Sequence, residues 1–121
     1  MKIRIQGNSV RLRLSRTEVE TLCLEGYIQE NTSFGSSIFS YAVKRAPLLN
    51  EIEASFNTSQ ITMFVPETFL KNWAENNIVG LDARMKIEAD KELYLLLEKD
   101  FKCLDTTEDQ SDNYENPNLT C

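Results

Sequence analysis

Apolar and polar residues alternate along the first part of the chain. Ile3 and Ile5 alternate with polar residues, and Val10, Leu12 and Leu14 continue the alternation after a short break. A period of two places every second side chain on the same face of a strand. The pattern therefore predicts a β-hairpin with one buried, apolar face.

Two local signals define the turn of this hairpin and the element that follows. Gly7-Asn8 lies between the strands, and glycine at the first central position suits a type II′ turn. Ser15-Arg16-Thr17-Glu18 has the spacing of a capping box, which predicts a helix start. This helix is expected to end near Gly26. Its expected apolar face consists of Val19, Leu22 and Cys23.

The same pattern recurs without a gap at an offset of 51 residues. Asn57 to Ser59 forms the expected turn, and Pro66 stands where Ser15 stood, preset for a first helical turn. The second helix is expected to end near Asn76-Asn77. The apolar positions of the second copy are Ile52, Ala54, Phe56, Ile61, Met63 and Val65 in the hairpin, and Phe69, Leu70 and Trp73 in the helix. An internal duplication explains this match, and chance similarity of two alternating segments is the alternative.

A second strand pair is predicted after each helix. These pairs are Tyr27 to Asn31 with Ser36 to Lys44, and Ile78 to Ile87 with Lys91 to Glu98. We expect one domain over residues 1–104, built of pseudo-repeats at 1–46 and 51–99. Because one unit is too small to bury a good core, the two should pack face to face or interleave. The expected fold is α+β, a pseudo-duplicated antiparallel β-barrel or sandwich with two short helices, and we favour the barrel.

Two resemblances add to this picture. The segment from Lys2 to Leu14 with its short capped helix resembles swapped-hairpin proteins of the AbrB and MazE type, and Gln60 to Glu67 resembles the same pattern. In that family, hairpins of two chains interleave into one barrel that binds DNA. The resemblance therefore implies such a barrel within one chain. The whole chain, including Glu98 to Leu104 and Glu108 to Pro117, resembles uncharacterised small proteins of Bacteroidetes, which implies a bacterial protein with no assigned activity.

Positive charge is concentrated at the start of an acidic chain. The net charge is −6, yet residues 1–16 contain five basic residues and no acidic one. They form a candidate anion or nucleic-acid patch, and a solvated outer face is the alternative. The matching strand positions of the second copy, Thr62 and Phe64, are not basic, which disfavours a two-fold DNA reader. The patch consists of Lys2, Arg4, Arg11, Arg13 and Arg16.

Residues 105–121 form an expected acidic C-terminal tail. Acidic, Asn- and Thr-rich composition buries little apolar surface, so disorder is expected there. Asp105, Asp109 and Asp112 are closely spaced oxygen donors, but the segment lacks the glycine and final glutamate of an EF-hand loop. We therefore predict no metal site. Another hypothesis is that the tail folds back over the basic face.

The chemistry of the side chains argues against catalysis. The chain has no histidine, so it cannot form a Cys-His or Ser-His pair. Its three cysteines lack metal-ligand spacing, and Cys23 is expected to be a small core residue. A thiol function of Cys103 beside Lys102 is a minor hypothesis. We expect no enzyme and no cofactor.

These observations lead to two functional hypotheses. No apolar run approaches the ~20 residues of a membrane span, and no signal peptide is evident, so we expect a cytoplasmic protein without a membrane partner. The first hypothesis is a small non-enzymatic interaction protein whose partner is another protein. The second is an AbrB-like DNA-binding regulator or antitoxin that uses the basic hairpin. Candidate exposed aromatics for the first are Tyr27, Phe34, Phe39 and Tyr41, with a core-facing position as the alternative for Phe39 and Tyr41.

Overall fold

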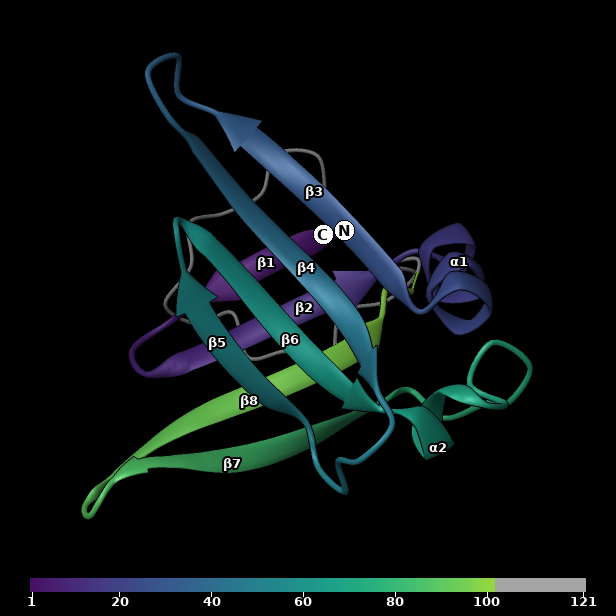
Figure 1. The fold of residues 1–121 in the computed structure, drawn as a ribbon. Coiled ribbons are helices and arrows are strands. Elements are labelled where there is room, and N and C mark those ends of the chain that lie inside the picture. The colour runs from purple at the N-terminus through teal and green to yellow at the C-terminus, as the bar shows by residue number, and fades with distance from the viewer. Residues whose placement is uncertain (102–121) are drawn as a thin grey trace, which may run out of the picture.

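The order of elements follows the predicted repeat. A computed structural model describes residues 1–101. Hairpin, helix and hairpin occur twice in succession (Figure 1), as the alternation predicted. The elements of the first half are β1 (Lys2–Ile5), β2 (Ser9–Leu14), α1 (Arg16–Glu25), β3 (Tyr27–Ser33) and β4 (Ile38–Ala46). Those of the second half are β5 (Glu53–Asn57), β6 (Gln60–Pro66), α2 (Glu67–Leu70), β7 (Gly80–Glu88) and β8 (Lys91–Lys99).

The strands form two four-stranded sheets, in the orders β1-β2-β8-β7 and β3-β4-β6-β5. Each hairpin is antiparallel, but the central pairs β2 with β8 and β4 with β6 are parallel. Each sheet therefore combines the first hairpin of one half with the second hairpin of the other half. The halves were expected either to pack face to face or to interleave, and they interleave. The expectation of purely antiparallel sheets was wrong, because interleaving brings these central strands together in the same direction.

The strand register is repeated in the two sheets. In the first sheet one cross-strand row runs through β1, β2 and β8, and the equivalent row of the second sheet runs through β5, β6 and β4. The matched rows are Ile3, Leu12 and Leu97 in one sheet and Ala54, Met63 and Val43 in the other. Chance alternation would not reproduce the pairing partners, so the register supports internal duplication.

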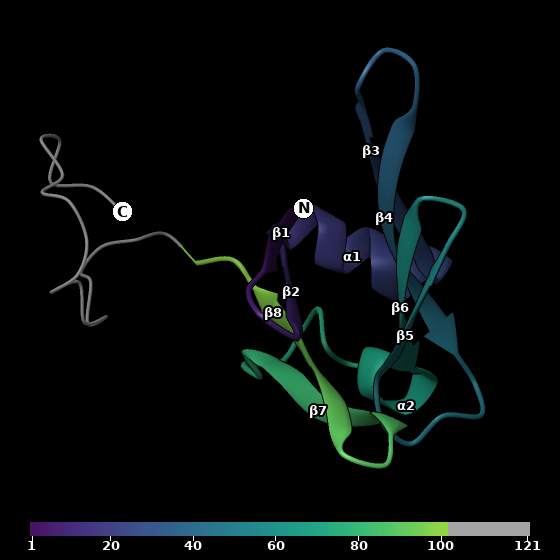
Figure 2. The ribbon, with the colours of Figure 1, turned by 90° about the vertical axis from the view of Figure 1, so that its left-hand side faces the viewer.

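The favoured closed barrel is not what forms. The described strands make two separate sheets that face each other across the core (Figure 2). A barrel requires one continuous hydrogen-bonded ladder with a fixed stagger. Within residues 1–101, β1, β7, β3 and β5 are sheet edges without a further strand beside them. Side-chain packing therefore joins the sheets.

The core lies between the sheets and is closed at one end by α1 and α2 (Figure 1). Its fully buried side chains come from the inward positions of the central strands and from the segments around both helices. They include Leu12, Leu14, Leu22, Val43, Met63, Val65, Trp73, Leu95 and Leu97. Burial of these side chains is the main source of stability.

The first helix begins and ends as predicted. The Glu18 N–H donates to Ser15 Oγ at 3.3 Å, and the Ser15 N–H donates to Glu18 Oε1 at 2.8 Å, completing the capping box. Gly26 adopts a φ of 78°, and its N–H donates to the Leu22 carbonyl at 2.8 Å. Val19 and Leu22 are buried, and Cys23 packs at the edge of the core.

The second helix is shorter than predicted. It ends at Leu70, and the chain continues through turns in which the Asn72 carbonyl accepts the N–H groups of Glu75 and Asn76. Pro66 provides no side-chain cap, so this helix lacks the hydrogen bonds that stabilise the start of α1. Trp73 lies beyond the helix but is still fully buried, as its apolar pattern required.

The β5-β6 turn holds two residues in a backbone conformation that they disfavour. Thr58 has a φ of 52° and Ser59 a φ of 61°, and both are in the left-handed region. Asn-Gly is the preferred pair at such a two-residue turn. Replacing Thr58 by Asn and Ser59 by Gly is therefore expected to raise the free energy of unfolding by about 1 kcal/mol. Urea unfolding of the double variant tests this, and a loss of stability would contradict the turn geometry.

Candidate functional site

Four of the five predicted basic residues share one face of the first sheet. Lys2 lies opposite Arg13, and Arg4 lies opposite Arg11, on β1 and β2. Because the alternate residues of β2 are buried in the core, these side chains point away from the second sheet. We call this surface the outer face of the first sheet. The fifth basic residue, Arg16, begins α1 and lines a different pocket.

Strand β8 brings carboxylates to the outer face. Glu98 Oε1 lies 3.3 Å from Arg11 Nε and 3.2 Å from Arg13 Nε. Asp100 Oδ2 lies 2.9 Å from Lys2 Nζ. The basic cluster is therefore partly neutralised. Sequence reasoning missed this, because the acids are far along the chain and reach β2 only through the parallel pairing.

Tyr94 of β8 is held on the outer face by polar partners from β7. Its hydroxyl donates to Asp82 Oδ2 at 2.8 Å, and the Arg84 guanidinium lies 4.9 Å from the centre of its ring. The hydrogen bond to Asp82 raises the pKa of the Tyr94 hydroxyl. These contacts fix the ring beside β2.

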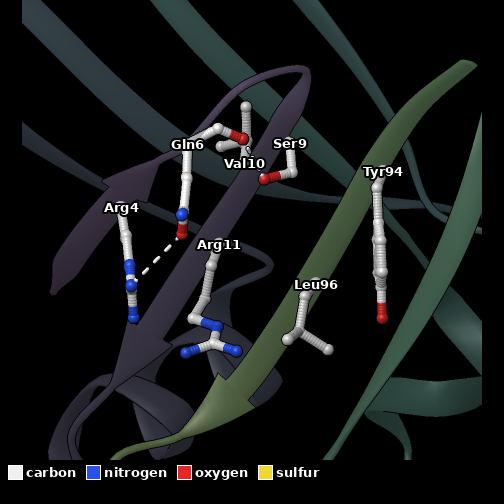
Figure 3. Close-up of a pocket in the computed structure, with 7 residues that line it drawn as sticks. All are labelled: Arg4, Gln6, Ser9, Val10, Arg11, Tyr94 and Leu96. Carbon is white, nitrogen blue, oxygen red and sulfur yellow. Dashed lines mark hydrogen bonds between the residues drawn. The ribbon is translucent and has the colours of Figure 1, made fainter. Parts of the chain in front are cut away.

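A hollow of about 250 Å³ lies between these strands on the outer face (Figure 3). Arg4 and Arg11 line it from one side and Tyr94 and Leu96 from the other, and we call it the arginine hollow. Arg4 Nη2 donates to Gln6 Oε1 at 3.2 Å. Among residues 1–101, no carboxylate lies within ion-pair distance of Arg4. Two guanidinium groups beside an aromatic ring suit a carboxylate or phosphate next to an apolar group.

The second sheet does not repeat the basic cluster. Its positions equivalent to Lys2, Arg4, Arg11 and Arg13 are occupied by other residue types, although the pairing is the same. These equivalents are Glu53, Ser55, Thr62 and Phe64. The outer faces of the two sheets therefore present different surfaces, as the sequence predicted for Thr62 and Phe64.

A second feature was missed by sequence reasoning. At the ends of the sheets away from the helices, the core is less covered: Val10 and Ile61 are 8% exposed, whereas Leu14 and Val65 are 0% exposed. An apolar groove of about 530 Å³ opens there between the sheets, and we call it the open-end groove. Its lining includes Ile5, Phe39, Phe56, Met85, Ile87 and Leu93.

Two residues expected to face the core instead line this groove. Ile5 is 57% exposed and Phe56 is 66% exposed, although both continue the apolar alternation of their strands. The pattern correctly assigned them to the inward face. It was wrong about burial, because the sheets leave the groove open between their ends at these two positions.

The candidate exposed aromatics have different environments. Tyr27 and Phe34 are exposed, and Phe39 is half-buried in the open-end groove. Tyr41 is only 9% exposed, and its hydroxyl donates to Glu30 Oε2 at 3.2 Å. For Tyr41 the core-facing alternative is therefore the correct one, since its ring packs in the core.

A small electrostatic cluster surrounds Tyr41. The ammonium group of Met1 contacts Glu18 and lies 2.6 Å from Glu30 Oε1. Burial alone would lower the pKa of this ammonium, but its hydrogen bonds to both carboxylates outweigh burial and raise it. Burial likewise opposes the charged form of Glu18, yet the hydrogen bonds from the ammonium and the Ser15 N–H lower its pKa. For Tyr41, burial and the nearby Glu30 both raise the pKa. The cluster ties β1 to α1 and β3.

Some of the cysteines and carboxylates singled out in the sequence lie outside the described residues. Cys23 packs against the core as predicted, and burial raises the pKa of its thiol. Cys103, the carboxylates of Asp105, Asp109 and Asp112, and the tail 105–121 all lie outside residues 1–101.

The chain was compared with known proteins by sequence and by structure. None of the helices within residues 1–101 is long and apolar enough to cross a membrane. No curated protein matches the chain, and no solved structure matches it. One family model does match, and it spans residues 1–118. This protein therefore belongs to DUF7009, a family of unknown function.

Proposed function

We propose that this protein is a small non-enzymatic interaction protein whose open-end groove binds an apolar segment of another protein. The observation that carries the proposal is the exposure of large apolar side chains around one groove. Phe56, Ile5 and Ile87 are 66%, 57% and 49% exposed, and all three line it. Contiguous exposed apolar surface of this kind marks interaction sites.

The shape of the groove favours a protein segment over a small molecule. Small-molecule sites bury most of the ligand surface in a concave pocket. This groove is open to solvent, and β1, β5 and β7, which line it, are edge strands. Apolar side chains of a partner segment would pack on Phe39 and Leu93, while exposed Phe56 and Ile87 would be covered from above. This geometry suits a peptide that inserts several side chains into a groove.

Nucleic-acid binding stays the alternative prediction for the outer face. Lys2, Arg4, Arg11 and Arg13 are on one surface, as the AbrB-like hypothesis requires. Glu98 and Asp100 oppose it, because they pair with three of these four cations. A phosphate backbone would also meet no equivalent basic cluster on the second sheet.

Site-specific photo-cross-linking tests the proposal. A photoreactive phenylalanine analogue is placed at Phe56 in the full chain, and cross-linking is carried out in the native host. We expect one dominant heterologous product, whose partner is then purified and titrated against the unmodified protein. Ile87→Glu should weaken that binding about tenfold or more, because a charged side chain would replace an apolar one that the bound partner covers.

The matched control is Leu48→Glu. Leu48 is 94% exposed and lies between β4 and β5, outside the groove lining, so this change should leave binding unchanged. Equal loss of binding in both variants, or no cross-linked partner, would refute the proposed function. A product containing only a second copy of this chain would reassign the groove to self-association.

A further inference from the structure

We propose that the arginine hollow is a carboxylate-binding site and that its occupant is this chain's own acidic segment, residues 102–121. The site is on the outer face of the first sheet, and the open-end groove lies between the sheets. The inference is therefore independent of the proposed function.

The β1-β2 half of the outer face carries an excess of positive charge. Its four cations, Lys2, Arg4, Arg11 and Arg13, meet two carboxylates, Glu98 and Asp100, which leaves two positive charges (4 − 2 = 2). Arg11 and Arg13 share one oxygen of Glu98. Within residues 1–101, the side chain of Arg4 makes a hydrogen bond to the neutral Gln6 amide and no ion pair. The charge excess is therefore greatest at the hollow.

The β7 side of the hollow lowers this excess without removing it, because Arg84, Asp82 and Glu92 together carry one negative charge (1 − 2 = −1). Asp82 accepts a hydrogen bond from the Tyr94 hydroxyl, and Arg84 lies over the Tyr94 ring and 4.0 Å from Glu92. These groups pair with one another and hold the Tyr94 ring as one wall of the hollow, beside Arg11. Leu96 adds an apolar side chain between Arg11 and Tyr94 (Figure 3). A ligand with a carboxylate and a neighbouring apolar group fits this combination.

Residues 102–121 have the composition that such a site would bind. They contain five acidic residues and one basic residue, Lys102, for a net charge of −4 (1 − 5 = −4). Tyr114 and Leu119 add apolar side chains near the end of the segment. The acidic residues are Asp105, Glu108, Asp109, Asp112 and Glu115.

The described chain ends close to the hollow. The Asp100 N–H donates to the Leu14 carbonyl at 2.8 Å, and its carboxylate pairs with Lys2, so residue 100 lies beside the first row of the basic cluster. The next row, formed by Arg4 and Arg11, is two residues further along the strands, about 7 Å away. From Phe101, the four residues to Asp105 can span about 13 Å.

Because the acidic segment is attached to the same chain, weak contacts are enough for it to occupy the arginine hollow. An attached segment binds at an effective concentration on the order of mM, whereas a separate anion competes at its free concentration. Exposed ion pairs contribute little one at a time, but the segment offers several carboxylates to the same two guanidinium groups. The segment therefore blocks the hollow against other anions at moderate concentration.

The test uses a full-length amide variant, in which all five acidic residues of the segment are replaced by their amides. This variant is titrated at low salt with a synthetic peptide of residues 102–121, and backbone amide NMR shifts are followed. We expect saturable shifts at Arg4, Arg11, Tyr94 and Leu96. The unmodified chain should bind the same peptide about tenfold more weakly, because its own segment already occupies the site. Adding Arg4→Gln and Arg11→Gln to the amide variant should also weaken binding about tenfold.

A control variant and a second readout make this test decisive. Lys44→Gln with Lys71→Gln removes the same charge from exposed positions on β4 and at the end of α2, and should leave peptide binding nearly unchanged. If the Arg variant does not fold, the shift difference at Arg4 and Arg11 between the unmodified chain and the amide variant still reports occupancy. Absence of peptide binding, or equal binding by the unmodified chain, would overturn the inference. So would binding of duplex DNA but not peptide to the amide variant, which would assign the hollow to nucleic acid.

Discussion

Replacing Trp73 by alanine is expected to lower the free energy of unfolding by about 3–5 kcal/mol. Trp73 is 0% exposed and its ring centre lies 5.0 Å from that of Phe69. Its indole N–H donates to the Ile78 carbonyl at 2.9 Å, and Lys99 Nζ lies 5.6 Å from the ring centre. The substitution would leave a large cavity at the closed end of the core and an unsatisfied carbonyl. Urea unfolding of the unmodified protein and of the variant, each followed by circular dichroism, measures this loss of free energy.

Two control variants separate the causes. Trp73→Phe keeps an aromatic ring but removes the indole N–H, so its loss should be clearly smaller than that of alanine. Leu48→Ala changes an exposed side chain and should alter the free energy of unfolding by less than about 0.5 kcal/mol. A loss below about 1 kcal/mol for Trp73→Ala would show that the closed end does not depend on this residue.

Replacing Gly80 by alanine is expected to cost about 3 kcal/mol, because β7 and β8 approach each other too closely there for a side chain. A Cβ atom on Gly80 would lie 2.0 Å from the Leu97 carbonyl oxygen and 2.8 Å from the Glu98 Cα. Both are backbone atoms, so the strand itself must move. That movement would disturb the Gly80 and Glu98 pairing and the hydrogen bond from the Lys99 N–H to the Val79 carbonyl. Thermal unfolding and hydrogen exchange of the β8 amides would both detect it.

Gly7→Ala provides the matched comparison. Gly7 has a φ of 54°, but no atom lies within 4 Å of the position that its Cβ would occupy. Only backbone strain is expected there, at about 1 kcal/mol. If the two alanine variants lose equal stability, the close approach at Gly80 does not limit the strand pairing.

The two candidate sites use different residues of the β1-β2 hairpin: Ile5 lines the open-end groove, and Arg4 and Arg11 line the arginine hollow. The open-end groove exists because Ile5 and Phe56 continue an apolar alternation past the point where the sheets cover it. The arginine hollow exists because β1 and β2 carry cations on the face opposite the core. Ile87 lines only the groove and Arg4 lines only the hollow, so changes at these two residues test the two sites separately.

Local signals in the sequence determined the elements of this protein. The alternation around Val10 and Ile61 predicted hairpins, and the Ser15 to Glu18 capping box predicted α1, because both depend on neighbouring residues. The repeat offset also predicted the order of hairpin, helix and hairpin in each half. These features could be read without knowing which strands lie side by side.

The tertiary structure alone decided how the elements combine. Alternation specifies the buried face of a strand but not its neighbour, so the parallel pairing of β2 with β8 could not be predicted. That pairing brings Glu98 to Arg11 and Arg13 and changes a basic hairpin into a partly neutralised face. The separation into two sheets likewise leaves the open-end groove uncovered. Both candidate sites depend on contacts between residues far apart in the chain, and only packing of the whole core determines those contacts.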